Sequence, residues 1–312
     1  MNKLLQPTLL ALLLAASPFG QAAETTNDDQ GAGAAFFLSR DNEGFTTRRL
    51  ALEYLPDYQH ADALTGVRYT DHHYSQHDWQ RDGQQIALLH RQIDPATANG
   101  WQIDTGLFRQ GGHDLVTLDG SYRRALAQRT GLELFVNRDW VETQHSLDRG
   151  VHFNYWGASL DQGLGEHLTL VGLAARQDFS DGNERSHGRL KLIYQPWLDL
   201  GLTLQARYRT YHSSSDDVDG AYFNPKNYDE SMLAVGWRKR LQGWTGTLTA
   251  GLGRQQVNDD PRSNTRLLEL GLQSPLRAQQ SLRLRGGYSQ SASFNGPDYR
   301  YRYLQGEWIA RF

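Results

Sequence analysis

The sequence predicts an all-β protein, a transmembrane antiparallel up-and-down β-barrel of about 16 strands. Three observations predict this fold. Apolar and polar residues alternate with a period of two along most of the chain, short and longer connections alternate, and the chain ends inside an apolar strand pattern at Phe312. Hydrocarbon cannot satisfy an unpaired strand edge, so a sheet in a membrane has to close on itself.

The first element is a secretory signal peptide over residues 1–22. Lys3 precedes an apolar run at residues 9–16, and small residues follow up to Ala22, after which we expect cleavage. The run is too short to cross a bilayer as a helix, and the order of charge, apolar run and small residues argues against a buried first helix. We expect residues 23–33 to form a short periplasmic segment ahead of a barrel over 34–312.

Composition narrows the class of protein. The chain of 312 residues has no Cys, 38% hydrophobic residues and a net charge of -3. The absence of Cys excludes a disulfide framework and thiolate chemistry, and no later segment is apolar for long enough to be a transmembrane helix. The near-neutral charge gives no nucleic-acid signature. The sequence predicts no cofactor and no metal.

Alternation is clearest in "GLTLQARYRTY" and recurs in "SLRLRGGYSQ", "RLKLIYQ", "GLELFVNRD" and "LVTLDGSYR". In the first of these, Leu202 and Leu204 fall on one face of a strand, while Arg207 and Arg209 fall on the other. The predicted strands cover residues 34–40, 45–55, 61–72, 81–92, 98–109, 113–124, 129–141, 150–161, 165–177, 187–197, 199–211, 228–240, 243–255, 264–275, 278–290 and 301–312.

The connections between these strands alternate in length. Short ones include "LPDYQ", "DPATAN", "ALAQRT", "DQGLGE", "QPWLD", "RLQGW" and "QSPLRA". Longer ones are "TDHHYSQHDWQRDG", "VETQHSLDRG", "DFSDGNERS", "HSSSDDVDGAYFNPKNY", "VNDDPRSN" and "SQSASFNGPDY". Short periplasmic turns opposite longer extracellular loops are typical of outer-membrane barrels, and an even strand count puts both termini in the periplasm.

A soluble β-sandwich or a two-domain secreted lectin would also show alternation. The sustained repetition, the terminal Phe312 and the aromatic residues near strand ends argue against it. These aromatic residues are Trp101, Tyr122, Trp197, Trp237, Trp244 and Trp308.

The last strand carries the first resemblance. Trp308 and Phe312 share one face of an alternating segment, and this ending resembles the C-terminal signal of bacterial outer-membrane proteins. The resemblance implies insertion into outer-membrane lipid by the barrel-assembly machinery, which reads that signal. It implies nothing about what the barrel transports.

The segment Tyr222, Phe223, Asn224 and Pro225 carries a second resemblance. It lies in the longest loop and leads into a late strand, with four more strands before the end. This arrangement resembles the C-terminal barrels of the exopolysaccharide-export porins, the outer-membrane proteins of poly-N-acetylglucosamine and cellulose secretion. The resemblance implies a polysaccharide as the transported partner.

The chain departs from that family ahead of the barrel. Family members usually carry a long periplasmic superhelix of tetratricopeptide repeats, and no helical repeat of that length is present in this sequence. If the resemblance holds, the scaffold is either a separate periplasmic repeat protein, as in some alginate-type systems, or dispensable.

Two interpretations of the Tyr222 to Pro225 segment have about equal weight. As loop chemistry, Asn-Pro favours a turn and the aromatic side chains pack over the barrel mouth. As a functional element, Tyr222 and Phe223 offer flat faces to sugar rings and guide a polysaccharide through weak, sliding contacts.

The predicted lumen face carries many charges. In the first half it has both signs, in Glu53, Asp104, Asp119, Glu133, Arg49, Arg68 and Arg123. In the second half it is basic, with Arg189, Lys191, Arg207, Arg209, Arg238, Arg283, Arg285 and Arg311. Cross-strand ion pairs that hold the walls together are the favoured interpretation, and attraction of an anionic polymer is the weaker one.

Catalysis and metal binding have little support. His212, Ser213 and Asp216 are close in sequence, but neighbours on an extended chain point to opposite faces and no nucleophile motif accompanies them. The spacing of His72, His73 and His77 matches no zinc pattern, and the run Asp216, Asp217 and Asp219 lacks EF-hand spacing.

The sequence therefore predicts an outer-membrane channel that exports an extracellular polysaccharide. Two alternatives stay open: a general or small-solute diffusion porin, and a barrel enzyme or surface adhesion protein.

Overall fold

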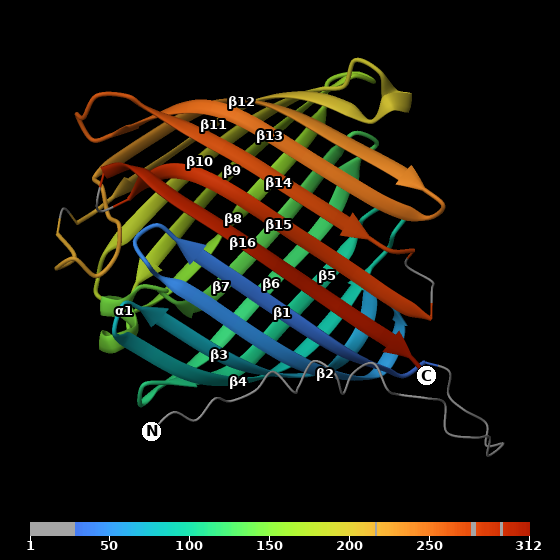
Figure 1. The fold of residues 1–312 in the computed structure, drawn as a ribbon. Coiled ribbons are helices and arrows are strands. Elements are labelled where there is room, and N and C mark those ends of the chain that lie inside the picture. The colour runs from blue at the N-terminus through green and yellow to red at the C-terminus, as the bar shows by residue number, and fades with distance from the viewer. Residues whose placement is uncertain (1–28, 216, 276–278, 294–295) are drawn as a thin grey trace.

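The computed structural model describes residues 29–215, 217–275, 279–293 and 296–312. The predicted signal peptide and most of the short segment after it lie outside the described residues. Sixteen antiparallel strands pair with their neighbours in sequence, and the first pairs with the last, so the sheet closes into a barrel (Figure 1). The predicted fold class is confirmed.

The elements have the following bounds: β1 (Gly31–Asp41), β2 (Thr46–His60), β3 (Ala63–Gln76), β4 (Trp79–Ile93), β5 (Gly100–Gln110), β6 (His113–Ala127), β7 (Thr130–Trp140), α1 (Gln144–Arg149), β8 (His152–Gly163), β9 (Leu168–Phe179), β10 (Glu184–Tyr194), η1 (Leu198–Leu200), β11 (Leu202–Ser213), β12 (Asn227–Leu241), β13 (Trp244–Val257), β14 (Ser263–Gln273), β15 (Gln280–Ser293) and β16 (Gly296–Arg311).

Each predicted strand overlaps one observed strand. The first strand begins three residues earlier than predicted: β1 starts at Gly31, and Gly33 belongs to it. These small residues give no apolar alternation to recognise. They are small because space is short: a Cβ on Gly33 would lie 2.9 Å from the Glu53 carboxylate.

The outer face of the barrel is apolar along its middle. Leu190, Leu204 and Leu233 are among the many exposed leucines, and Leu233 is 73% exposed. Burying these side chains in lipid removes them from water, so the barrel has the outer surface of a membrane-spanning sheet. Within the described residues, no helix is both long and apolar enough to cross a membrane.

Aromatic residues collect around one end of the barrel. Trp101 and Tyr122 are register partners, and Trp237 and Trp244 flank the turn between β12 and β13. Trp197 lies in the connection between β10 and β11 at the same end. This is the end at which β1 begins and β16 finishes. The position matches an interfacial aromatic girdle.

The predicted lengths of the connections need correction at the other end. There, β3 and β4 are separated by residues 77–78 and β9 and β10 by residues 180–183, where longer loops were predicted. The strands run on past the apolar belt, where their outward-facing residues are polar, so their sequences resemble loops. Two connections at this end are distinctly long, 141–151 and 214–226.

Candidate functional site: a charged lumen with a covered mouth

The inner face follows from the apolar outer face by alternation. Leu190 and Leu192 point outward from β10, so Arg189 and Lys191 point into the barrel. The same parity holds on the other strands, and it gives the barrel a polar lumen. This lumen, together with the segments that cover its mouth, is the candidate functional site.

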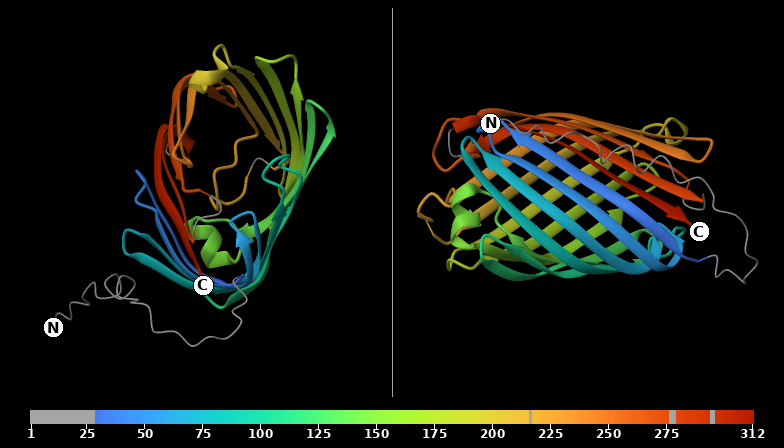
Figure 2. Two further views of the ribbon diagram at one scale, coloured as in Figure 1. Left: turned by 90° about the vertical axis from the view of Figure 1, so that its right-hand side faces the viewer. Right: turned by 60° about the horizontal axis from the view of Figure 1, so that its bottom comes forward.

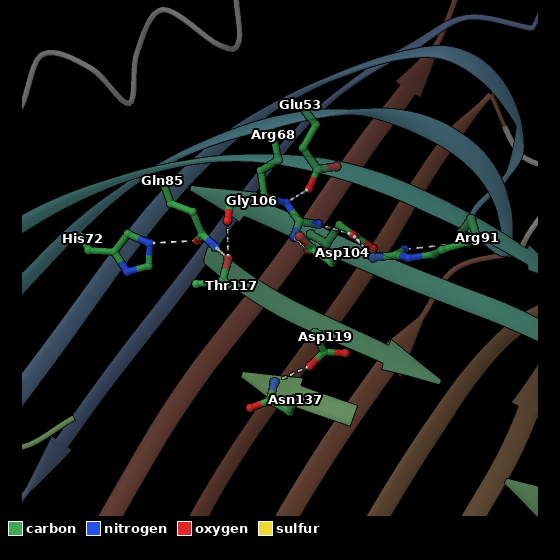
Figure 3. A network of polar contacts seen from close by, with 12 residues as sticks. Glu53, Arg68, His72, Gln85, Arg91, Asp104, Gly106, Thr117, Asp119 and Asn137 are labelled. Atoms are coloured by element: carbon green, nitrogen blue, oxygen red, sulfur yellow. Dashed lines mark hydrogen bonds and ion pairs between the residues drawn. The ribbon is translucent and has the colours of Figure 1, made fainter. Parts of the chain in front are cut away.

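One part of the lumen wall, on β2 to β5 and β16, is a network of ion pairs (Figure 3). Arg68 Nε donates to Glu53 Oε1 at 2.7 Å, and Arg68 Nη1 donates to Asp104 Oδ2 at 2.5 Å. The side chain of Glu53 is only 1% exposed. Arg91 Nη2 donates to Glu307 Oε1 at 3.3 Å. These pairs neutralise one another, as the favoured interpretation of the lumen charges expects.

Neutral polar contacts extend this network (Figure 3). Gln85 Nε2 donates to Thr117 Oγ1 at 2.8 Å, and Gln85 Oε1 lies 3.2 Å from His72 Nε2. Asn137 Nδ2 donates to Asp119 Oδ2 at 2.9 Å. The network borders a cavity of about 560 Å³. Side chains on this side of the lumen are therefore tied to one another across several strands.

The basic residues of the second half have a different environment. Three of the eight predicted cations are paired: Arg209 with Glu230 at 2.5 Å, Arg283 with Asp62 at 2.6 Å and Arg311 with Asp29 at 2.7 Å. Among the described residues, no carboxylate lies at ion-pair distance from the other five. These are Arg189, Lys191, Arg207, Arg238 and Arg285.

A row of aromatic rings on the same wall was missed from the sequence. The Tyr155 and His187 ring centroids are 5.2 Å apart, His187 and Tyr211 are 5.6 Å apart, and Tyr211 stacks on Tyr228 at 4.7 Å. The first three rings are half-buried on the inner faces of β8, β10 and β11. We call Tyr155, His187 and Tyr211 the aromatic row. Alternation along the strand could have revealed its inward direction, because Tyr211 lies on the same strand face as Arg207 and Arg209.

The short helix α1 covers part of the mouth opposite the rim where β1 starts and β16 ends (Figure 2). Thr143 caps its N-terminus by accepting from the Ser146 backbone N–H, and Gly150 ends it in the left-handed region. Leu147 is fully buried in a cluster with Tyr74 and Phe108 on the inner wall. Apolar burial therefore holds α1 against β3 and β5.

The described residues of the 214–226 connection, 214–215 and 217–226, also fold inward and meet α1 (Figure 2). Ser146 Oγ donates to the Ala221 carbonyl at 2.8 Å, and the Thr143 hydroxyl donates to the same oxygen. Arg149 forms an ion pair with Asp219 at 3.0 Å. We call α1 and the 214–226 connection together the mouth cover.

The structure places Tyr222 differently from the guiding role that was considered for it. Its side chain is 4% exposed and stacks on Phe179, so its faces are not available to a sugar. Asn183 Nδ2 donates to the Tyr222 hydroxyl at 3.1 Å, and the hydroxyl donates to Asp181 Oδ2 at 2.9 Å. Burial, together with the Asp181 carboxylate, raises the pKa of Tyr222 above its usual range.

The other three residues of the segment, Phe223 to Pro225, lie beside the buried Tyr222 side chain. Arg185 Nη2 donates to the Phe223 carbonyl at 2.8 Å and to Asn224 Oδ1 at 3.0 Å, and Pro225 is buried. Phe223 is half-buried and lines two cavities. For Tyr222, Asn224 and Pro225 these contacts correspond to the loop interpretation, in which the segment packs over the mouth.

The catalytic and metal candidates are dispersed. His212 Nδ1 lies 2.8 Å from Asn227 Oδ1, whereas Ser213 is fully buried and its hydroxyl accepts from Arg185 Nε at 3.2 Å. Asp216 lies outside the described residues. The placement of His72 and His73 in one loop is corrected: both are on β3, at successive positions that face opposite ways. Within the described chain, no group of three or more potential ligands could hold a metal ion.

The last strand ends at the rim that carries the aromatic girdle. Trp308 Nε1 donates to Gln280 Oε1 at 3.3 Å, and the Phe312 side chain is 60% exposed. The Phe312 backbone N–H donates to the Gln30 carbonyl at 2.9 Å. The end of β16 is thus paired to the residue just ahead of β1, while the terminal ring stays accessible.

No protein-family model matches the chain, and no curated protein matches its sequence. Among solved structures, it is similar to one described as a bacterial polysaccharide outer membrane secretin, with a TM-score of 0.67 and 13% identity over 92% of this chain and 99% of that chain. Pseudomonas aeruginosa OccD3 (OpdP) aligns with a TM-score of 0.46 and 10% identity over 91% of each chain. CdiB from Acinetobacter baumannii has a TM-score of 0.45 and 11% identity over 93% of this chain and 61% of its own.

At 13% identity, the first of these likenesses shows the fold. The expected resemblance to the barrels of exopolysaccharide-export porins is therefore confirmed at the level of architecture, a closed 16-strand barrel. Which substrate passes the lumen has to be argued from the side chains that line it.

Proposed function

We propose that the protein is an outer-membrane channel through which an extracellular polysaccharide leaves the cell. The observation that carries this proposal is the aromatic row on the lumen wall. The apolar belt and the fold support the location, and the resemblance to a polysaccharide secretin supports the direction of transport.

The aromatic row suits a sugar chain because it places half-buried rings in succession along the lumen wall. Tyr211, at one end of the row, is stacked on Tyr228 and has the Arg185 guanidinium over its ring. The rings of Tyr155, His187 and Tyr211 come from three strands and touch in sequence. A pyranose ring has one face of C–H groups, and aromatic rings contact such faces without fixing a single orientation. A polymer can then move from one ring to the next without a deep energy well.

A second set of lumen aromatics lies on β1 and β16. The rings of Phe37 and Tyr303 stack with centroids 6.3 Å apart, and those of Tyr301 and Tyr303 are 6.0 Å apart. Phe223 of the mouth cover is the remaining candidate from the predicted guiding segment. A chain in the lumen would therefore find aromatic contacts on two walls.

In this proposal the barrel uses no energy of its own. The polysaccharide synthase supplies the movement, a separate periplasmic repeat protein delivers the chain, and the mouth cover moves aside during passage. Both termini are then periplasmic, and the mouth cover faces the cell exterior.

Deletion of the gene and complementation test the proposal. We expect deletion to abolish the surface polysaccharide and the wild-type gene to restore it. A Tyr155→Ala, Tyr211→Ala double variant should restore much less polymer at equal barrel abundance. The matched control is Tyr194→Ala with Tyr208→Ala, which removes two aromatic rings from the outer face of β10 and β11. An unchanged amount of surface polymer after deletion would refute the proposal.

Conductance separates the export channel from a general porin. With purified protein in a planar bilayer, added polysaccharide should reduce the current of the wild type and reduce it less in the Tyr155→Ala, Tyr211→Ala variant. A steady current that no polysaccharide affects would favour a diffusion porin.

A further inference from the structure

Like charges face one another on two neighbouring strands of the lumen wall. Arg189 of β10 is the register partner of Arg209 of β11, and Lys191 is the register partner of Arg207. Directly opposite residues of an antiparallel pair have Cβ atoms about 4.5–5.5 Å apart, and like charges at such positions destabilise the sheet. Two consecutive pairs of this kind need a compensating partner.

Within the described part of the chain, only one of these four charges has a carboxylate at ion-pair distance. Arg209 pairs with Glu230 Oε2 at 2.5 Å. Arg207 donates to the neutral Gln205 Oε1 from Nη2, at 2.7 Å. No carboxylate among the described residues is at ion-pair distance from the other three cations. We call Arg189, Lys191 and Arg207 the cationic strip.

The cationic strip lies at the depth of the membrane. Arg189 and Lys191 alternate with Leu190 and Leu192, which point toward lipid. Charged residues at this depth face water or a partner inside the barrel, and they commonly mark the path of a substrate or ion. Arg189 is also well exposed, so a solute in the lumen can reach it.

A nearby hydroxyl group has no partner either. The Tyr155 hydroxyl is buried, and no described residue forms a hydrogen bond with it. Arg189 is the charged group that acts on this hydroxyl. Tyr155 therefore connects the strip to the aromatic row.

The network on the opposite side of the lumen provides the contrast. There, Arg68 contacts Glu53 and Asp104, and Arg91 contacts Glu307. Ion pairs that stabilise the wall account for those cations. They do not account for the cationic strip, for which Glu269 of β14 is the carboxylate within electrostatic range of Lys191.

We infer that the cationic strip binds the anionic groups, carboxylate or phosphate, of the chain that passes through the lumen. This inference rests on the proposed function, because it names the chemical class of the exported polysaccharide. Arg presents a planar fork that matches carboxylate and phosphate oxygens, and Lys adds a mobile point charge. Arg189, Arg207 and Lys191 would hold successive charges while the aromatic row contacts the sugar rings.

Block of the full-length mature protein in planar bilayers tests the inference. The probes are oligogalacturonate, polyphosphate and neutral maltodextrin of matched length. We expect an anionic probe to block at a lower concentration than maltodextrin. In an Arg189→Gln, Lys191→Gln, Arg207→Gln variant, its half-blocking concentration should rise about tenfold or more, and permeability to anions relative to cations should fall.

The matched control removes three cations from the outer face. Arg48, Lys239 and Arg254 are exposed, and each alternates with lumen-facing neighbours, so their replacement by Gln should leave block unchanged. Glu269→Gln gives a change of opposite sign: it should strengthen block by the anionic probe. This variant keeps the inference testable if the triple variant does not fold.

The three probes separate the possible ligands. Stronger block by oligogalacturonate supports a carboxylate-bearing polymer, and stronger block by polyphosphate supports a phosphate-bearing one. Equal block by maltodextrin, or unchanged block in the triple variant, would overturn the inference. Neither result affects the gene-deletion test, so the channel proposal and the substrate class fail separately.

Discussion

The ring of Tyr222 lies face to face on the ring of Phe179, with centroids 4.4 Å apart and planes 13° from parallel. Phe179 is the last residue of β9, and Tyr222 belongs to the 214–226 connection. Val151 and Ala221 complete the buried cluster around this stack. The mouth cover is therefore fastened to the barrel wall mainly by side chains, which a conformational change can release without breaking the sheet.

Tyr222→Ala should open the mouth. Loss of a buried aromatic side chain costs about 3–5 kcal/mol. The conformation in which the mouth cover is closed should therefore lose most of its stability relative to the open one. Tyr222→Phe keeps the stack and loses only the hydroxyl contacts, for a cost of about 1 kcal/mol. Single-channel recording should show larger or longer openings for Tyr222→Ala, with Tyr222→Phe close to wild type. Identical openings in all three proteins would contradict this account of the anchor.

Ser146→Ala should loosen the contact between α1 and the 214–226 connection. It removes one of the two hydroxyl donors to the Ala221 carbonyl from a fully buried position, and the Thr143 hydroxyl still donates there, so the cost is about 1 kcal/mol. We expect faster cleavage within the connection by a protease added to protein in detergent micelles. His145→Ala, on the exposed face of the same helix, should leave the cleavage rate unchanged.

Arg68→Gln should destabilise the whole barrel. It leaves the buried Glu53 carboxylate without its ion-pair partner, which costs about 3–5 kcal/mol. Urea titration of the protein in lipid vesicles measures this change. The exposed Arg109–Asp114 pair is the control, and Arg109→Gln should cost less than about 1 kcal/mol. An Arg68→Gln, Glu53→Gln double variant should regain part of the loss.

Leu233→Arg tests which face contacts lipid. Leu233 lies near the middle of β12 on the outer face, and an arginine at the bilayer midplane costs about 2–4 kcal/mol. Thr249→Arg, on the adjacent strand with its side chain toward the lumen, should cost much less. If both variants lost the same unfolding free energy in vesicles, the assignment of Leu233 to the lipid face and Thr249 to the lumen face would be wrong.

Phe312→Ala tests the proposed assembly signal. We expect less folded protein in the outer membrane of cells. The folded and unfolded forms can be separated on gels of unboiled samples, where the unfolded form migrates more slowly. Refolding of the same variant from urea into detergent should match wild type, because the Phe312 ring is exposed and packs little. An equal defect in detergent would indicate a structural role instead.

The strands could be predicted because the membrane and the lumen impose opposite chemistry on successive residues. Leu190, Lys191 and Leu192 reveal this directly, and their parity places the basic residues on the inner wall. The same rule fails beyond the lipid. Asp71, His73 and Ser75 belong to β3 yet resemble a loop, since the outward-facing residues there are polar, while Tyr74 on the inner face is buried against Leu147 of α1.

The mouth cover could not be predicted because its partners are distant in sequence. Nothing near Tyr222 indicates that Phe179 and Asp181 will meet it. The aromatic row has the same difficulty, because Tyr155, His187 and Tyr211 lie on separate strands and only the register aligns them. Parity shows which way a side chain points, but the neighbours across the lumen depend on closure and shear.

The seam between β1 and β16 has a consequence for how the molecule forms. Gly31 pairs with Arg311 and Asp41 with Tyr301, so the final contacts join opposite ends of the chain. Contacts between residues so far apart in sequence form slowly. The free edges of β1 and β16 therefore remain open to incorrect partners until synthesis is finished. A catalyst that shields the two edges until they meet would therefore govern the yield of the protein more than the stability of the finished cylinder does.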